Sequence, residues 1–413
     1  MLAVTYDRGA ASAAEIATAL AAETSLAFLV PAGDYTDWVR PVLAELGEVV
    51  DLTGGDEDVQ RVRELGPDGI VTFSESMLRE TCRLTTALGL PGHSARTVRL
   101  LTDKFEQRTR LAEAGVDSVR HHVIDTPADW PAALAAVGLP AIVKPLYGGG
   151  SRDTHLVPDA AAALRLAREL PGGMVLEEFL QGRPSMPYGD YVSVESLCSP
   201  GRITNVAITG KFPQMRPFRE LGHIWPADLP AHETTEVTGL VTRALRALGV
   251  EFGIAHTEVK LTATGPRIIE VNGRLGGYVN ELSRRSCGVD LVRIAGLLAL
   301  GKDAWSDPVA PARVHFQYWG AGPTDPCELV ATHGVKAARR VKGITGYRPL
   351  IRTGQRLDGG VMTNQLHLLC GDTEDHVAMF AALDEALAQL TYEFRFDDGE
   401  LALQAPPRTW RTS

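Results

Sequence analysis

Several features that define common classes of protein are missing from this sequence of 413 residues. No run of about 18 uncharged apolar residues occurs, and the longest candidate, residues 291–300, is short and contains Arg293. The first thirty residues carry four charged side chains among the apolar ones, unlike a secretory signal. We therefore predict neither a membrane-spanning helix nor a secreted protein.

Paired cysteines are also missing. The five cysteines are odd in number, and none belongs to a Cys-x-x-Cys pair. A disulfide framework or a zinc site is therefore not expected, and the reducing cytoplasm is the simplest location. The five are Cys82, Cys198, Cys287, Cys327 and Cys370.

The sequence has no basic run, and its formal net charge is −10. Nucleic acids and anionic membrane surfaces both attract Lys and Arg, so neither is an expected partner. The hydrophobic fraction of 45% and the charged fraction of 22% are ordinary for a globular protein. The length is typical of two or three domains.

Three well-known motifs are absent. No G-x-G-x-x-G follows the first expected strand, so a nicotinamide cofactor is not indicated. The Walker A pattern and the G-x-S-x-G nucleophile elbow do not occur either.

What is present begins with alternating strands and helices over residues 1–90. We expect strands at 2–6, 25–30, 47–51 and 69–73 and a helix at 10–22, which together predict a parallel sheet covered by helices. A single helix is expected over 94–114, with Ser94 as its N-cap.

The middle of the chain is richer in strands. We expect strands at 119–124, 141–145, 154–157, 174–179, 191–197, 203–209, 257–261 and 267–271, and helices at 127–136, 159–169 and 232–248. Glycine and proline gather around 301–323, which indicates a linker or boundary. We expect four parts, covering residues 1–100, 101–185, 186–300 and 301–413.

Two lysines and a glycine-rich loop follow one another in this order. Lys104 follows an acidic residue, and Lys144 ends an apolar strand, where a charge needs either a salt bridge or an anionic ligand. The run Gly148-Gly149-Gly150-Ser151 comes next, and such glycines let backbone N–H groups approach an anion. Each of these features has an ordinary structural explanation when taken alone.

The strand expected at 174–179 continues as Glu177-Glu178-Phe179-Leu180-Gln181-Gly182. A strand with acidic and apolar residues that ends at glycine suits a sheet edge whose backbone hydrogen-bonds a purine. An ordinary edge strand is the alternative.

The most specific pattern is a hairpin. His256-Thr257-Glu258 opens its first strand, and Glu270-Val271-Asn272 closes its second. Alternate residues of a strand share a face, so Glu258, Glu270 and Asn272 can meet as an oxygen-only set that suits Mg²⁺. Cross-strand lysine–glutamate pairs are the alternative. Ile269 and Val271 are expected on the apolar face.

In this order, the five segments resemble the ATP-grasp superfamily from about residue 90 to residue 300. The resemblance implies an α/β (α+β) ATP-grasp fold with an N-terminal Rossmann-like domain, a small β-rich lid and a large mixed C-terminal domain. It implies ATP and two Mg²⁺ ions as cofactors, with Mn²⁺ able to substitute. Lys104, Lys144 and the loop from Gly148 to Ser151 then correspond to the phosphate ligands.

The remaining roles follow from the same resemblance. Glu177, Phe179 and Leu180 correspond to adenine contacts, and Glu258, Glu270 and Asn272 to metal ligands. Arg274 is at the position of an arginine that binds the acyl phosphate. An insertion at 183–188 precedes Asp190, which stands where relatives have a ribose-binding glutamate.

Within the superfamily, the chain is most similar to bacterial L-amino-acid ligases. Glu220, His223, Arg274, Gly276 and Gly277 then correspond to substrate contacts, while Glu220, His223 and His256 are candidates for the base that accepts a proton from the amine. The implied reaction is ATP-dependent activation of a carboxylate and coupling to an amine, with small molecules as partners and a homodimer as one possible assembly. Alternatives are a biotin-carboxylase-like or purine-pathway enzyme, an enzyme of natural-product biosynthesis acting on a specialised acid or carrier protein, and a regulatory module that binds nucleotide without turnover.

Overall fold

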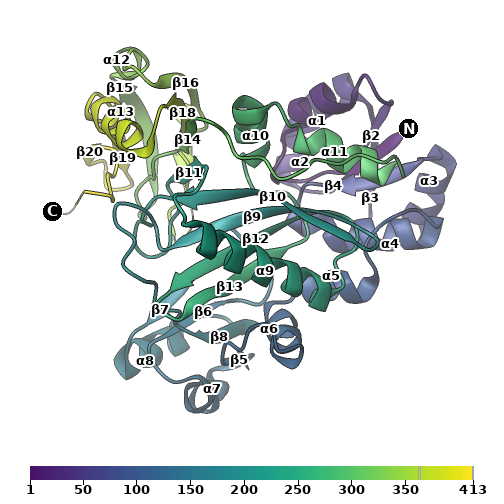
Figure 1. The fold of residues 1–413 in the computed structure, drawn as a ribbon, viewed down its shortest axis with the longest axis horizontal. Coiled ribbons are helices and arrows are strands. Elements are labelled where there is room, and N and C mark those ends of the chain that lie inside the picture. Colours follow the sequence, from purple (N-terminus) through teal and green to yellow (C-terminus); the bar gives the residue numbers. More distant parts are fainter. Residues whose placement is uncertain (361, 363, 412–413) are drawn as a thin grey trace.

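The computed structural model describes residues 1–360, 362 and 364–411, and their elements are arranged around one large central sheet (Figure 1). A parallel sheet lies at one end of it, a small antiparallel sheet lies below it, and the C-terminal elements lie at the other end. Among the described residues, no helix is long and apolar enough to cross a membrane.

The N-terminal sheet is parallel, as the alternation predicts, with the order β3-β2-β1-β4. Helices cover both faces, which explains why β1 and β2 are almost continuous apolar runs. The order reverses between β1 and β4, and ligands bind at the carboxyl ends of strands beside such a point. The strands are β1 (Leu2–Thr5), β2 (Leu26–Pro31), β3 (Glu48–Leu52) and β4 (Gly69–Thr72), and the helices are α1 (Ala13–Leu20), α2 (Asp34–Leu46), α3 (Glu57–Leu65), α4 (Leu78–Leu88) and α11 (Leu291–Ala299).

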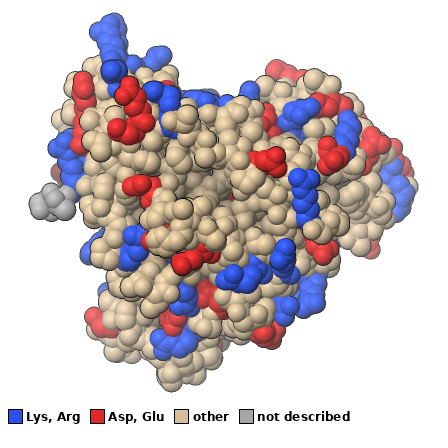
Figure 2. All heavy atoms as spheres, viewed as in Figure 1, with Lys and Arg blue, Asp and Glu red and all other residues tan. Residues whose placement is uncertain are grey.

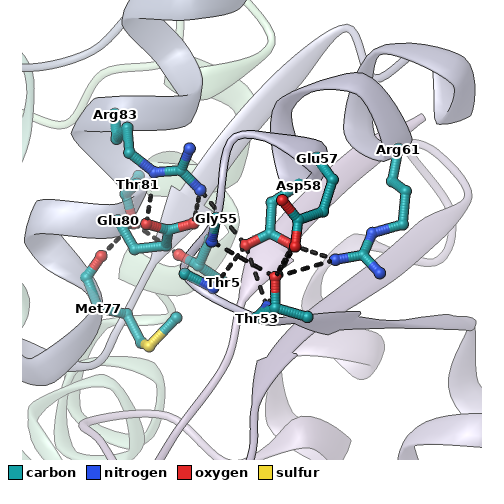
Figure 3. A network of polar contacts seen from close by, with 11 residues as sticks. Thr5, Thr53, Gly55, Glu57, Asp58, Arg61, Met77, Glu80, Thr81 and Arg83 are labelled. Atoms are coloured by element: carbon teal, nitrogen blue, oxygen red, sulfur yellow. Dashed lines mark hydrogen bonds and ion pairs between the residues drawn. The ribbon is translucent and has the colours of Figure 1, made fainter.

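A buried carboxylate ties the loop after β3 to α4 (Figure 3). Asp58 accepts hydrogen bonds from the backbone of Thr53 at 3.0 Å and Gly54 at 2.8 Å, and it pairs with Arg61 and, at 3.4 Å, with Arg83 of α4. Burial favours the neutral acid, but these donors outweigh it and hold the pKa of Asp58 below its usual range. The network fixes α4 and therefore the short helix η1 (Glu75–Met77) that leads into it.

The prediction of one helix over 94–114 is wrong, because the chain forms α5 (Ala95–Thr102) and α6 (Lys104–Glu113). Asp103 is extended, and its side chain accepts hydrogen bonds from the N–H groups of Phe105 and Glu106 at 3.0 and 3.1 Å. It is thus the N-cap of α6, which ends one helix and begins the next. Ser94 caps α5 as predicted, accepting from Thr97 N at 3.1 Å.

The small sheet is antiparallel, with the order β5-β8-β6-β7. Strand β8 is therefore internal, and the prediction that it is a sheet edge is wrong. Its residues pair with β5 on one side and β6 on the other, because the β6–β7 hairpin adds on the far side of β6. The elements are β5 (His121–Ile124), α7 (Trp130–Val137), β6 (Ala141–Pro145), β7 (His155–Val157), α8 (Ala160–Glu169) and β8 (Met174–Glu178).

The central sheet has eight strands in the order β13-β12-β9-β10-β11-β14-β18-β16. Strands from beyond residue 300 thus extend the sheet in which the hairpin lies. They are β9 (Tyr191–Ser199), β10 (Arg202–Lys211), β11 (Gly222–Trp225), β12 (Gly253–Thr262), β13 (Gly265–Asn272), β14 (Val314–Tyr318), β16 (Ile344–Pro349) and β18 (His367–Thr373).

The two faces of this sheet differ. Helices α9 (Ala231–Leu248) and α13 (His376–Ala388) bury one face in apolar cores. The other face carries the polar residues of β9, β10 and β12, and α10 (Val279–Cys287) packs beside it. A second small sheet ends the chain and is made of β15 (Cys327–His333), β17 (Arg356–Leu357), β19 (Thr391–Phe396) and β20 (Leu401–Gln404), with α12 (Val335–Ala338) after β15. On the surface shown in Figure 2, basic and acidic side chains are interspersed.

Candidate active site

The hairpin brings the predicted metal ligands together. Glu258 lies directly opposite Glu270, and His256 lies opposite Asn272. Asn272 is 3% exposed, and its Oδ1 has no hydrogen-bond partner among the described residues. A buried acceptor without a partner beside two carboxylates fits a hard cation. The described residues contain no cluster of three His, Cys, Asp or Glu side chains suited to a metal, so this set depends on the amide oxygen.

A β-bulge changes the apolar side of the hairpin. After Glu258 the register shifts, and Val259 pairs with Ile268. Ile268 and Val271 are therefore buried in the core, while Ile269 is partly exposed. The prediction that Ile269 shares the apolar face with Val271 is wrong, because strict alternation does not hold across a bulge.

His256 lies between two carboxylates. Its Nδ1 bonds to Glu195 of β9, and its Nε2 is 3.7 Å from Glu258 Oε1. Burial alone would lower the pKa of His256, but Glu195 and Glu258 raise it well above its usual value. The two carboxylates thus favour the protonated ring, which suits compensation of their charges better than acceptance of a proton from an amine.

Glu195 also holds the turn after the hairpin. This carboxylate is fully buried, and its Oε2 accepts a hydrogen bond from Gly276 N at 3.1 Å. A Cβ at Gly276 would lie 2.5 Å from His256 Nδ1 and 2.8 Å from Glu195 Oε1, so only glycine fits there. At Gly277 a Cβ would meet no atom of the described chain within 4 Å, so there is free space beside the backbone of that residue.

Arg274 points its nitrogens in three directions. Nε is 3.2 Å from Glu75 Oε2 of η1, and Nη1 donates to the carbonyl of Leu275 at 2.9 Å. Nη2 lies 3.7 Å from the position that a Cβ at Gly149, in the glycine-rich loop, would occupy. Burial raises the pKa of Glu75, and Arg274 opposes that shift. Sequence reasoning missed Glu75, although it lies three residues after the end of β4, at the reversal point of the N-terminal sheet.

Lys104 connects the hairpin to the glycine-rich loop. Its Nζ is 3.6 Å from Glu270 Oε1 and donates a hydrogen bond to the carbonyl of Gly148. Gly148 and Gly150 have φ of 103° and 71°, in the left-handed region that favours glycine. The loop is thus held close to the predicted metal ligand Glu270 and to Arg274.

Lys144 belongs to a buried ion-pair triad. Glu177 pairs with Arg108 at 2.8 Å and with Lys144 at 3.0 Å. Burial would raise the pKa of Glu177, but the two cations lower it to about 2. Arg108 also donates to the backbone of Ile268 at 2.6 Å, so the triad joins the small sheet to the hairpin. The side chain of Glu177 thus pairs with Arg108 and Lys144. The sequence predicts an adenine contact for this residue instead.

The residues predicted around the base and ribose lie after β8 of the small sheet and before β9 of the central sheet. Phe179 and Leu180 follow β8 and are half-buried, and Phe179 N donates to the carbonyl of Pro140 at 3.2 Å. Asp190 accepts a hydrogen bond from Lys260 Nζ at 2.7 Å and is partly exposed.

A second polar cluster lies further across the same face of the central sheet. Glu220 accepts from Tyr191 Oη at 2.8 Å and is 3.3 Å from Lys211 Nζ. His223 is buried edge-on against Trp319, with ring centroids 4.9 Å apart, and burial holds its pKa well below the usual value. His223 lies on β11, three strands from β12, and is paired with Lys211 of β10, the residue that Glu220 contacts from the segment before β11.

Comparison with known proteins identifies the domain that carries this site. A family model described as an ATP-grasp domain matches residues 103–278. The alanine–anticapsin ligase of Bacillus subtilis (strain 168) is 29% identical over 273 residues, which cover 60% of this chain and 57% of that protein. Carnosine synthase 1 of Gallus gallus is 29% identical over 282 residues, which cover 62% of this chain and 29% of that protein.

A solved structure extends the similarity to almost the whole fold. The L-amino acid ligase from Bacillus licheniformis superposes with a TM-score of 0.79 at 23% identity, covering 94% of this chain and 97% of that one. The curated relatives are matched over little more than half of their length or less, whereas the fold is shared from end to end. Residues 103–278 are therefore an ATP-grasp domain, and the chain that carries it shares its overall fold with the L-amino acid ligase from Bacillus licheniformis.

Proposed function

We propose that this protein is an ATP-dependent ligase that activates the carboxylate of an amino acid as an acyl phosphate and couples it to an amine, releasing ADP and phosphate. One observation carries the proposal. Two carboxylates and an unpartnered amide oxygen lie on one face of the hairpin, in contact with Lys104 and two residues before Arg274. These are the charges that phosphoryl transfer to a carboxylate requires.

Each group of residues in this site has its own role in the proposed reaction. Glu258, Glu270 and Asn272 would hold Mg²⁺, which when bound neutralises charge on the phosphates. Lys104 and Lys144 bind the phosphates, and the loop from Gly148 to Ser151 covers them and excludes water that would hydrolyse the acyl phosphate. Arg274 stabilises negative charge at the acyl group. Phe179, Leu180 and Asp190 border the nucleoside.

The relatives support the nucleotide and the reaction class. The two relatives from Bacillus are named as ligases that act on amino acids. Solved neighbours of the same fold contain ADP, and one contains its magnesium salt. We also propose small-molecule substrates, a cytoplasmic location and a division of the chain at about residues 100, 185 and 300. A homodimer is a further proposal, which the dimeric carboxylase domain among these neighbours supports.

The test is phosphate release from Mg-ATP with the twenty amino acids, singly and in pairs. Glu270→Gln removes one charge from the proposed metal set, and Glu393→Gln, on β19 in the C-terminal sheet, is a matched control. Release that needs particular amino acids and is lost only in Glu270→Gln supports the ligase. Release that needs bicarbonate or formate instead would replace it by a carboxylase-type or purine-type reaction.

A further inference from the structure

The base of the glycine-rich loop is tied to the junction between α5 and α6. Three successive residues at this base each bond to the dipeptide Asp103-Lys104. The carbonyl of Leu146 accepts a hydrogen bond from Lys104 N at 3.1 Å, and the carbonyl of Gly148 accepts one from Lys104 Nζ. Between them, the hydroxyl of Tyr147 donates to Asp103 Oδ2 at 2.9 Å.

Tyr147 is held by polar contacts rather than by burial, since the residue is 51% exposed. Besides the bond to Asp103, its ring lies beneath a cation, with 4.5 Å between the guanidinium carbon of Arg79 and the ring centroid. Arg79 is itself oriented by a hydrogen bond from its Nε to Thr102 Oγ1 at 3.1 Å. Two directional contacts therefore fix an aromatic side chain that the apolar core does not hold.

Both partners of Tyr147 lie on firmly placed elements outside the small sheet. Asp103 uses its other oxygen, Oδ1, to cap α6, so the carboxylate cannot move without loss of the cap. Arg79 belongs to α4, which the network of Asp58 and Arg83 fixes to the N-terminal sheet (Figure 3). Tyr147 therefore connects the small sheet to both of these elements.

The tip of the loop depends on this base. Gly149 and Gly150 follow directly and are exposed, and Gly150 and Ser151 have φ of 71° and 56°, in the left-handed region. Glycines offer little resistance to a change of backbone conformation. A displacement of Tyr147 would therefore pass to the tip, which lies beside Arg274.

We propose that Tyr147 is a positioning residue for the glycine-rich loop. Its hydroxyl on Asp103 and its ring beneath Arg79 hold the loop in the position that covers the phosphates. The consequence for catalysis rests on the proposed function: a loosened loop admits water, and the acyl phosphate is then hydrolysed before the amine attacks it.

The first test is limited proteolysis of the full chain by trypsin, which cuts after lysine and arginine. Arg152 is exposed and directly follows the loop, so cutting at this residue reports how often the loop opens. The rate is measured by mass spectrometry of the fragments. The measurement needs no nucleotide, no amino acid and no turnover.

Three variants separate the two contacts. Tyr147→Phe removes only the hydroxyl, and cutting after Arg152 should become about 5- to 10-fold faster, less than for a buried bond because the site is half-exposed. Arg79→Gln removes the cation over the ring and should give about a 2- to 5-fold increase. Tyr147→Ala loses both contacts and should be cut faster than either, so that phenylalanine partly rescues alanine.

The matched control is Leu156→Ala on β7, in the same hairpin of the small sheet. Leu156 is also exposed, at 39%, and its variant should be cut after Arg152 at the wild-type rate. Equal rates for wild type, Tyr147→Phe and Tyr147→Ala would overturn the proposal. An equal acceleration in Leu156→Ala would overturn it as well, because it would indicate a general loosening of the small sheet.

The second test is the amount of phosphate released for each amide formed, with the amino acids that support turnover. The wild type should release about one phosphate per amide, as the coupled reaction requires, and Tyr147→Ala several-fold more. An unchanged ratio in a variant whose loop opens would refute the role in excluding water. If no amino acid supports phosphate release, the ligase is contradicted, whereas the proteolysis still decides whether Tyr147 positions the loop.

Discussion

Replacing Gly276 by alanine places a methyl group against two buried side chains. The new Cβ would lie 2.5 Å from His256 Nδ1 and 2.8 Å from Glu195 Oε1, closer than real contacts allow. Neither side chain has room to withdraw, because Glu195 is fully buried and His256 is 5% exposed. The turn must therefore shift and weaken the hydrogen bond from Gly276 N to Glu195.

The cost follows from these two effects. Overpacking a buried site and weakening a hydrogen bond to a charged group together cost about 2–4 kcal/mol of unfolding free energy. Arg274 is two residues away, and a displacement of about 1 Å in a reacting group lowers the rate by about 100-fold. Gly276→Ala should therefore lose both stability and turnover.

Urea denaturation and phosphate-release kinetics measure the two losses. Gly277→Ala is the matched stability control, because its Cβ would meet open space and its change should stay within about 1 kcal/mol. Equal unfolding midpoints for the two alanine variants would refute the packing around Gly276 described above.

Three further predictions concern buried charges. Arg108→Met removes one of two cations from buried Glu177 and should cost about 3–5 kcal/mol by urea denaturation; a loss below about 1 kcal/mol would mean that Lys144 alone compensates the carboxylate. Asp58→Asn keeps the shape of the side chain but loses its charge, and should cost about 1.5–3 kcal/mol at pH 7. Because the folded-state pKa of Asp58 is lowered, this contribution is present above its ordinary pKa of 3.8 and fades as the pH falls below it, so a difference between wild type and variant that persists undiminished at pH 3 would contradict the account. Burial lowers the pKa of His367 to about 3, so the unfolded chain takes up the proton first, and stability falls as the pH drops from about 6.5 to about 3. His367→Gln should flatten that slope in acid denaturation, and an unchanged slope would contradict the assignment.

Local patterns predicted most of the fold. The strands of the N-terminal sheet and of the hairpin lie where apolar runs and turn residues indicate, because both signals are contained in a few neighbouring residues. The pairing of Glu258 with Glu270 was also predictable, since a short turn fixes the register of a hairpin.

What local patterns missed depends on contacts between distant segments. Glu75 and Arg274 meet only when the N-terminal sheet packs beside the hairpin, and Glu195 gains its role from His256 on the neighbouring strand. The bulge that buries Ile268 and the cap at Asp103 that splits a helix are single-residue departures from regular periods. Neither has a strong sequence signature when the flanking pattern is regular.

The central claim is that a carboxylate is activated as an acyl phosphate. It can be tested by supplying an amino acid labelled with ¹⁸O in its carboxylate, together with the amine and Mg-ATP, and analysing the released phosphate by mass spectrometry. The account predicts one ¹⁸O atom in each phosphate released during coupling, because the carboxylate oxygen that attacks the γ-phosphate leaves with it. Label that remains wholly in the coupled product, or that appears in AMP, would contradict it.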